Sequence, residues 1–567
     1  MTAKAELVIV GRVATLARER GFGWVEALAI AGGRVLATGR AADLEALAGP
    51  ATTTWRLAPE ELVMPAITDA HIHLLGLAVG RTQVDLSGAT DLDGTLALLA
   101  AAHHGLLAAS DDSGWVRGHG WSPAVIGGWP TTAELERACP GRPVALWAHD
   151  HHARWVSAAA LALAGVDRAT PDPAGGVIRR DERGEPTGVL HEKAANLVDA
   201  VLPDADAARL ATDLRAVAAE LAALGVTGAH DPGELDASAG IGRSQLLYRD
   251  LAAQGRLPLR VHASLRAHQL AEAIAHGMRS GDGVPAADAA DPRSRRLAER
   301  YRFGWLKLFV DGALGSRSAL LLEPYTDAAE RPPTGGPSGM YQTAPDELAA
   351  LLARAWSGGI SAQLHAIGDG AVRLALDLLA SQPELPLRPR IEHAQLIDPA
   401  DVPRFGRLGV AASVQPVHLR SDAAIARAGW GERAERAFPL AGLVAGDALV
   451  PFGTDAPVEP IDPWAGIAVA VARRDPFAPA DVPLGADQAL DLPRALRGAC
   501  LDPPLSAGQA HLGRLVAGAR ADLLVVPAAG FDEPFDAARM AGTRPLATLL
   551  DGELVYRAQQ FDPAGGR

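Results

Sequence analysis

The feature that most constrains the fold is a series of eight short apolar runs separated by helix-like segments rich in alanine and leucine. Such alternation is typical of a parallel sheet with helices packed on its outside, and eight strands close that sheet into a barrel. We therefore expect an α/β protein with a (β/α)8 TIM-like barrel over residues 63–504. The expected strands are Val63–His73, Gly225–His230, Leu259–Leu265, Trp305–Asp311, Ile360–His365, Arg390–His393, Val410–Gln415 and Leu449–Asp455.

Both ends of the chain carry short β-like runs joined by hairpin turn signals. Gly32-Gly33 lies between two such runs near the start, and Asp551-Gly552 lies between two near the end. This symmetry predicts that residues 1–62 and 505–567 together form a small β-sandwich domain.

The first and second expected barrel strands are separated by roughly 150 residues, far more than one βα connection needs. This length predicts a large insertion, a subdomain over the barrel mouth at residues 76–220. The insertion is rich in tryptophan, which forms either an apolar lid or the core of the subdomain. These tryptophans are Trp115, Trp121, Trp129, Trp147 and Trp155.

Composition narrows the function classes. The 567 residues are 48% hydrophobic and 21% charged, a normal globular balance, and the net charge of −14 comes without a Lys/Arg block. This pattern disfavours nucleic acid as a partner. Cys139 and Cys500 cannot form a disulfide framework, and no run is long enough to span a bilayer. We expect a cytoplasmic protein with a small-molecule substrate and no membrane or nucleic-acid partner.

Histidines and one aspartate end several of these runs. The first ends in Asp69-Ala-His71-Ile-His73, and alternate residues of a strand share a face, so both histidines can reach one ion. His365 and His393 end the fifth and sixth runs, and Asp455 ends the eighth. Barrel enzymes keep their active sites at these carboxyl ends. The sequence therefore predicts a metal centre, although Asp455 alone is also compatible with capping the turn before Pro457.

Lys307 lies inside the fourth apolar run, where an uncompensated ammonium is costly. It needs a partner, such as Asp311, or a changed chemical state. Glu392 precedes His393 and should therefore point to the opposite face of its strand, which indicates a structural role.

Taken together, these motifs resemble the amidohydrolase superfamily, and specifically amidohydrolase family 3, the YtcJ-like metal-dependent hydrolases. The resemblance runs from about residue 6 to residue 556 and departs at Val156-Ser157-Ala158, where relatives tend to have Asn before the Ser. The motifs that carry it are Asp69–His73, Lys307–Arg317, His365–Asp369, Ile391–Gln395, Val414–His418 and Gly453–Pro457.

The resemblance implies a role for each matching residue. His71, His73, His365 and His393 would be metal ligands, with Asp455 as acid/base and further ligand. Lys307 matches the position where superfamily members often carry a carbamylated lysine that bridges two metals. Carbamylation by CO2 would turn the buried ammonium into an anion, and a plain lysine paired with Asp311 remains the alternative. Zinc fits the histidine ligands, while manganese, iron and the number of ions, one or two, stay open.

The expected reaction is hydrolysis of an amide-like C–N bond, in an N-substituted formamide or another amide, by water that the metal activates and Asp455 deprotonates. A lactone, ester or cyclic amide hydrolase, a deaminase and a non-catalytic binding barrel are the alternatives. The family also suggests a homodimer. Arg317 is expected either to hold a substrate carboxylate or to brace Asp311, and Gln415 and His418 either line the substrate or make ordinary loop hydrogen bonds. The expected substrate-binding residues are Trp121, His152, Arg317, Gln415 and His418.

Overall fold

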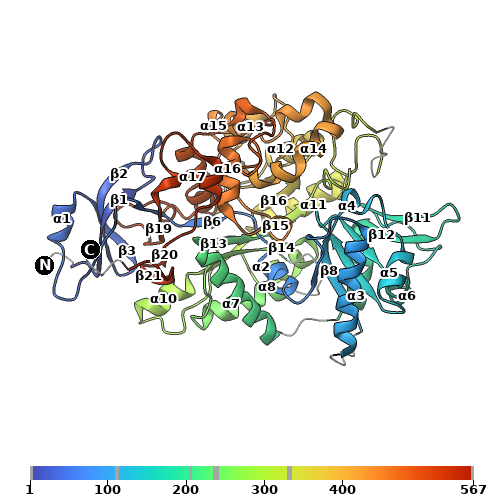
Figure 1. Cartoon of the computed structure of the whole chain (residues 1–567), viewed down its shortest axis with the longest axis horizontal. Helices are drawn as coiled ribbons and strands as arrows, with labels where there is room; N and C mark the ends of the chain where they lie inside the picture. Colours follow the sequence, from blue (N-terminus) through green and yellow to red (C-terminus); the bar gives the residue numbers. More distant parts are fainter. Residues whose placement is uncertain (1–3, 109–113, 204–206, 234–241, 329–334, 563–567) are drawn as a thin grey trace.

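The computed structural model describes residues 4–108, 114–203, 207–233, 242–328 and 335–562. Figure 1 shows three units along the longest axis: a sheet that holds both chain ends, a central α/β domain, and a second sheet at the opposite end. None of the helices in the described ranges is both long and apolar enough to cross a membrane.

The central domain is a TIM-like α/β unit. Seven strands pair in parallel in the order β18-β17-β16-β15-β14-β13-β6. Their burial is almost complete, as expected for a parallel sheet covered by helices. The strands are β6 (Ile67–Asp69), β13 (Val226–Asp231), β14 (Arg260–Arg266), β15 (Tyr301–Phe309), β16 (Ala362–Ala366), β17 (Arg390–His393) and β18 (Ala411–Ser413).

Helices follow the strands on the outside of this sheet. The amphipathic helix α12 buries one apolar face against the core and begins directly after the β16 segment that carries His365. The main covering helices are α2 (Leu74–Gly80), α7 (Ala207–Ala223), α8 (Arg243–Ala253), α9 (Leu270–Ala275), α10 (Pro292–Ala298), α11 (Pro345–Ser357), α12 (Asp369–Leu379), α13 (Val402–Leu408), α14 (Leu419–Trp430), α15 (Leu440–Ala445), α16 (Pro463–Ala472), α17 (Leu492–Cys500) and α18 (Asp502–Ser506).

The eighth expected run, Leu449–Asp455, closes the ring without forming a regular strand. It makes one parallel bridge, Val414 with Phe452. On one side Ala412 N–H donates to Leu449 O at 2.9 Å, and on the other Ala70 N–H donates to Phe452 O at 2.9 Å. Pro451 lies within the run and has no N–H to donate, which limits a continuous ladder there.

The first expected run, Val63–His73, is divided between two sheets. Its first part is β5 (Glu61–Pro65), which pairs with β1 and β19 of the terminal sheet, and only β6 belongs to the barrel. The terminal sheet and the barrel are therefore joined by a single intervening residue, Ala66.

Strands from both chain ends form one sheet, in the order β21-β20-β19-β5-β1-β2-β3 with β4 beside β1. The strands form a single sheet in the described residues, so the two-layered sandwich remains a prediction. The first three and last five residues of the expected domain lie outside the described part of the chain. Its elements are β1 (Leu7–Ala14), β2 (Trp24–Ala31), β3 (Arg34–Gly39), α1 (Ala41–Glu45), β4 (Thr53–Arg56), β19 (Leu523–Pro527), α19 (Ala537–Ala541), β20 (Ala547–Leu550) and β21 (Glu553–Arg557).

The segment between β6 and β13 carries its own six-stranded sheet, in the order β11-β12-β10-β9-β8-β7. Trp121 and Trp155 are fully buried in its core, whereas Trp129 and Trp147 are only partly buried. Trp121, Trp129 and Trp147 also line a cavity. The tryptophans thus serve both as core and as cavity wall. The elements are β7 (Val84–Asp85), α3 (Leu92–Ala108), β8 (Val116–Trp121), α4 (Pro123–Ile126), α5 (Thr132–Ala138), β9 (Val144–Ala148), β10 (Ala153–Val156), α6 (Ala158–Ala164), β11 (Gly176–Arg180) and β12 (Pro186–Glu192).

Candidate active site

A cavity of about 1440 Å³ lies where the barrel faces the inserted sheet. Its walls combine side chains from the carboxyl ends of β15, β16 and β17 with side chains from β8, β9, β11 and β12. The expected metal ligands and several residues of the insertion therefore face one space.

Asp455 lies at the centre of a group of histidines. Its Oδ1 is 3.4 Å from His71 Nε2 and 3.4 Å from His73 Nε2, and its Oδ2 is 3.9 Å from His393 Nδ1 and 3.6 Å from His418 Nε2. The position is fixed from the backbone, because Asp455 N–H donates to His71 O at 2.7 Å. Burial would raise the pKa of Asp455, but the facing imidazoles hold it well below its usual range.

Donor chemistry in this group fits a divalent metal. Ligand atoms of His71, His393 and Asp455 lie within 4.8 Å of one another, and all three residues are buried. His73 Nδ1 and His418 Nε2 are buried and have no hydrogen-bond partner among the residues described. Imidazole nitrogens and a carboxylate oxygen are the donors that zinc and related ions accept.

Two of the histidines are held through their second ring nitrogen. His71 Nδ1 lies 2.5 Å from Glu392 Oε2, and His393 Nδ1 lies 2.8 Å from Gln415 Oε1. Both contacts leave Nε2 available to bind an ion, which is the arrangement that metal-binding histidines usually have.

These contacts change the expected roles of Glu392 and Gln415. Glu392 points to the barrel interior, toward His71, on the same face of β17 as Arg390, whose Nε lies 2.8 Å from Glu392 Oε1. His393 also reaches the interior because its left-handed backbone, with a φ of 69°, breaks the strand alternation. Gln415 is buried behind His393 and is not among the cavity-lining residues, so the structure does not place it against a substrate.

His365 lies beside this group but is oriented differently. Its ring centroid is 4.5 Å from that of His393, and its Nε2 is 3.2 Å from Gly312 O and 3.7 Å from Asp311 Oδ1. Nδ1 is therefore the His365 atom that remains for an ion.

Lys307 is buried at the cavity wall, and burial lowers its pKa to about 7. Among the described residues it makes no hydrogen bond or ion pair, and its ammonium lies 5.0 Å from the Phe309 ring centroid. The alternative partner Asp311 is occupied: its carboxylate accepts the N–H groups of Leu320, Ile367 and Gly368. Lys307 thus presents an amine that is partly uncharged near neutral pH.

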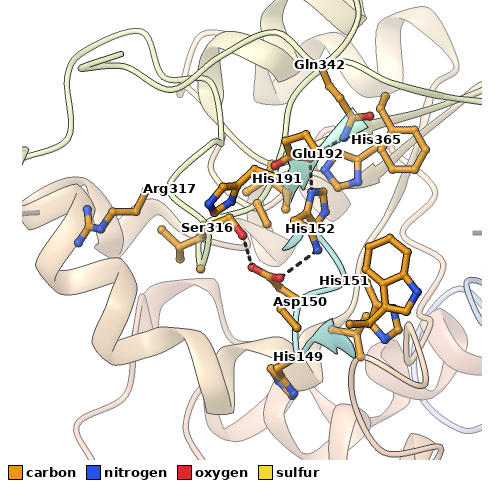
Figure 2. A pocket seen from close by; sticks show the side chains of 18 of the residues that line it. His149, Asp150, His151, His152, His191, Glu192, Ser316, Arg317, Gln342 and His365 are labelled. Atoms are coloured by element: carbon orange, nitrogen blue, oxygen red, sulfur yellow. Dashed lines mark hydrogen bonds and ion pairs between the residues drawn. The ribbon is translucent and has the colours of Figure 1, made fainter. Parts of the chain in front are cut away.

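The insertion contributes a hydrogen-bonded histidine next to His365. His152 Nδ1 donates to Glu192 Oε2 at 2.8 Å, and its ring centroid lies 5.1 Å from that of His365. Figure 2 shows His152 between Asp150 and Glu192. Burial would lower the pKa of His152, but the Glu192 carboxylate raises it to about 9.

Glu192 connects the insertion to the barrel. Its Oε2 also accepts from Gln342 Nε2 at 2.6 Å, and its Oε1 accepts from the Ser318 hydroxyl. Asp150 accepts from Ser316 Oγ at 2.6 Å. The sequence predicts His152 as a substrate-binding residue, but no local signal identifies Glu192, whose partners in the barrel are 126 and 150 residues away.

Three other residues that are expected to bind the substrate differ in how they lie relative to the cavity. Trp121 lines the cavity, and its Nε1 donates to Leu146 O at 3.0 Å. His418 lines the cavity beside Asp455. Arg317 also lines the cavity, but in Figure 2 its guanidinium points away from Asp150, His152 and Glu192. It forms a bidentate pair with Asp327, so it neither braces Asp311 nor has a free fork.

A TIM-like barrel whose strand ends gather imidazoles and a carboxylate defines the class of metal-dependent hydrolases. The model of the amidohydrolase family matches residues 58–556, and the chain belongs to this family. The chain is 32% identical over 507 residues to the putative amidohydrolase YtcJ of Bacillus subtilis (strain 168), covering 87% of this chain and 89% of that protein.

Further relatives agree with this assignment. An N-substituted formamide deformylase of Arthrobacter pascens is 28% identical over 550 residues, with 94% and 95% of the two chains covered. Among solved structures, an uncharacterized metal-dependent hydrolase from Pyrococcus horikoshii OT3 is similar with a TM-score of 0.71 and 25% identity, covering 92% of this chain and 97% of that one.

Proposed function

We propose that this protein hydrolyses an amide-like C–N bond of a small organic substrate at a metal centre formed by the residues around Asp455. The observation that carries the proposal is the Asp455 carboxylate, which faces four imidazoles at 3.4–3.9 Å inside a cavity. Distances in this range exceed hydrogen bonds and leave room for an ion between the groups. The proposed ligands are His71, His73, Lys307, His365, His393 and Asp455.

A bound divalent metal supplies two things: it lowers the pKa of water toward neutrality and polarises the carbonyl oxygen. Asp455 remains ionised because imidazoles surround it, so it can accept a proton from water and pass it to the departing nitrogen. His71 and His393 are kept in one orientation by Glu392 and Gln415, which fixes the ligand atoms.

Lys307 is proposed to become carbamylated and to bridge two ions. Carbamylation requires an uncharged amine, and the lowered pKa of Lys307 provides one near neutral pH. The new carbamate would carry a negative charge beside the cations and would remove the cost of a buried ammonium without a partner. Zinc is the proposed metal because most of the donors are imidazoles.

The substrate is proposed to be an N-substituted formamide or another amide, with support from the formamide deformylase relative. The cavity of about 1440 Å³ exceeds the roughly 300–1,000 Å³ of a typical small-molecule site, so a substituent larger than a formyl group can enter.

Metal analysis together with turnover tests this proposal. Purified wild-type protein is expected to hold about two ions per chain, and Lys307→Ala about one, if the lysine bridges a binuclear centre. Chelation should abolish amide hydrolysis, and zinc or manganese should restore it. Failure of the wild-type protein to retain metal after reconstitution with either ion would overturn the hydrolase proposal, and equal metal content in Lys307→Ala would restrict it to one ion.

A further inference from the structure

The outer wall of the cavity, formed by the hairpin of β11 and β12 together with Trp129, contains a cationic side chain that the proposed chemistry does not use. We propose that Arg179 binds a carboxylate of the substrate beside Trp129, so that the enzyme selects amides carrying a carboxylate group. This inference rests on the proposed function and names its substrate class.

The hairpin directs several side chains into the cavity. Val177 on β11 is paired with His191 on β12, and Arg179 lies two residues beyond Val177, where the register of the hairpin shifts. All three line the cavity, as do Trp129 and Lys193. This part of the cavity wall is therefore positively charged and partly aromatic.

Trp129 holds the guanidinium in place. Arg179 Cζ lies 4.9 Å from the Trp129 ring centroid, and the His191 ring packs edge-on against the same tryptophan, at 4.6 Å and 78°. Stacking leaves the edge of a guanidinium, with its N–H groups, available for a planar acceptor such as carboxylate.

Arg179 lacks an anion of its own. Within the described residues it makes no ion pair or hydrogen bond, and burial lowers its pKa without any carboxylate to offset the effect. The neighbouring Arg180 is the opposite case, because its guanidinium donates to the carbonyls of Asp167, Arg168, Thr170 and Gly184. A partly buried cation without a partner is costly, and a carboxylate from a ligand would remove that cost.

His191 supplies an independent sign of a ligand. It is 1% exposed, it lines the cavity, and neither of its ring nitrogens has a hydrogen-bond partner in the part of the chain that the structure describes. A buried imidazole without partners is unusual. A carboxylate held by Arg179 would offer it an acceptor.

Nearby acidic groups of the cavity do not compete for Arg179. Glu192 is held by His152, Gln342 and Ser318, and Asp150 by Ser316.

Glu192 follows His191 directly in the chain, and its partner His152 packs against His365. The proposed carboxylate subsite and the proposed metal ligands thus lie along one continuous wall.

Two anilides that differ only in charge test the inference. Glutaryl-4-nitroanilide has a terminal carboxylate, and pentanoyl-4-nitroanilide is its neutral counterpart. Metal-loaded wild type is expected to prefer the glutaryl compound in kcat/KM. Arg179→Gln should lower kcat/KM for that compound by about tenfold or more, mainly through KM, and leave the neutral one unchanged. Arg183→Gln, which changes an exposed arginine of the same hairpin, is the control and should behave as wild type.

A binding measurement separates the two proposals. Calorimetric titration of metal-loaded protein with glutarate should show affinity at least about tenfold lower for Arg179→Gln than for Arg183→Gln. If Arg179→Gln hydrolysed the anilides with the same preference in kcat/KM for the glutaryl compound as wild type, the carboxylate subsite would be overturned but the hydrolase proposal would stand. Glutarate binding that depends on Arg179, without turnover of either anilide, would retain the subsite and count against the amidase. The subsite would be overturned if Arg179→Gln left the affinity for glutarate unchanged. It would also be overturned if the protein neither bound glutarate nor hydrolysed either anilide.

Discussion

Two buried carboxylate clusters lie at opposite ends of the barrel strands, and they are built differently. At the amino-terminal end, Arg260 at the start of β14 binds both oxygens of Asp522 at 2.7 and 3.0 Å and one oxygen of Asp551 at 2.5 Å. Arg300 and Arg520 also reach Asp551, at 3.4 and 3.2 Å. At the carboxyl-terminal end, the ion-pair partners of Asp455 among the described residues are all imidazoles, none closer than 3.4 Å.

The contrast distinguishes a structural connection between the barrel and the terminal sheet from the proposed reaction centre. Short charge-assisted bonds at Arg260 connect the barrel to β19 and β20 of the terminal sheet and leave no carboxylate oxygen there without a cation. The longer separations around Asp455 leave the charges incompletely matched, as expected where an ion and a substrate must enter. We therefore expect substitutions at one cluster to change stability and at the other to change chemistry.

Asp455→Asn should have the largest effect. Removal of the acid/base is expected to reduce kcat for amide hydrolysis about a thousandfold. The melting temperature should change little, because no side-chain hydrogen bond of normal length is lost. Steady-state kinetics on metal-loaded protein and thermal unfolding provide the two readouts. A variant with near wild-type kcat would exclude Asp455 as the proton acceptor.

Arg260→Gln should act at the other cluster. It leaves Asp522 and Asp551 buried with less compensation and is expected to lower the free energy of unfolding by about 3–5 kcal/mol. Arg293→Gln is a suitable control, since its pair with Glu553 is exposed to solvent and should contribute little to stability. Chemical denaturation measures both. Equal stability of the two variants would show that the buried connection is dispensable, and a loss of kcat per folded molecule would contradict the separation of roles.

Gln415→Leu should have the smallest effect and sharpens the comparison within the active site. Loss of the acceptor for His393 Nδ1 is expected to weaken metal affinity about tenfold. Competition with a chelator measures this change, and KM of the metal-saturated variant should remain near the wild-type value. A raised KM with unchanged metal affinity would instead indicate that Gln415 contacts the substrate.

Sequence patterns could predict the histidines because strand geometry is local. His71 and His73 are expected from alternation along one strand; both reach the centre, although β6 ends at Asp69 and the two histidines lie in the segment that follows it. The apolar runs that end in His365 and His393 place these residues at the same level of a barrel. The recognition of the family rests on these same motifs.

Tertiary partners could not be predicted in the same way. Asp327 as the partner of Arg317 depends on how a loop folds back, and the orientation of His393 depends on its own left-handed backbone conformation. Pro451 leaves the eighth run as a single bridge. The apolar composition of that run gave no sign of this outcome.

The division of one run into β5 and β6 has a consequence for how the protein is made. β5 pairs with β19, so residues 61–65 can complete their pairing only after residues 523–527 have been synthesised. Of the two strands that pair with β5, β19 is the later one in the chain. Until then a nascent or prematurely ended chain exposes an apolar strand edge directly before the segment that carries His71 and His73. Chains that end before β19 should therefore aggregate instead of forming a partly active barrel.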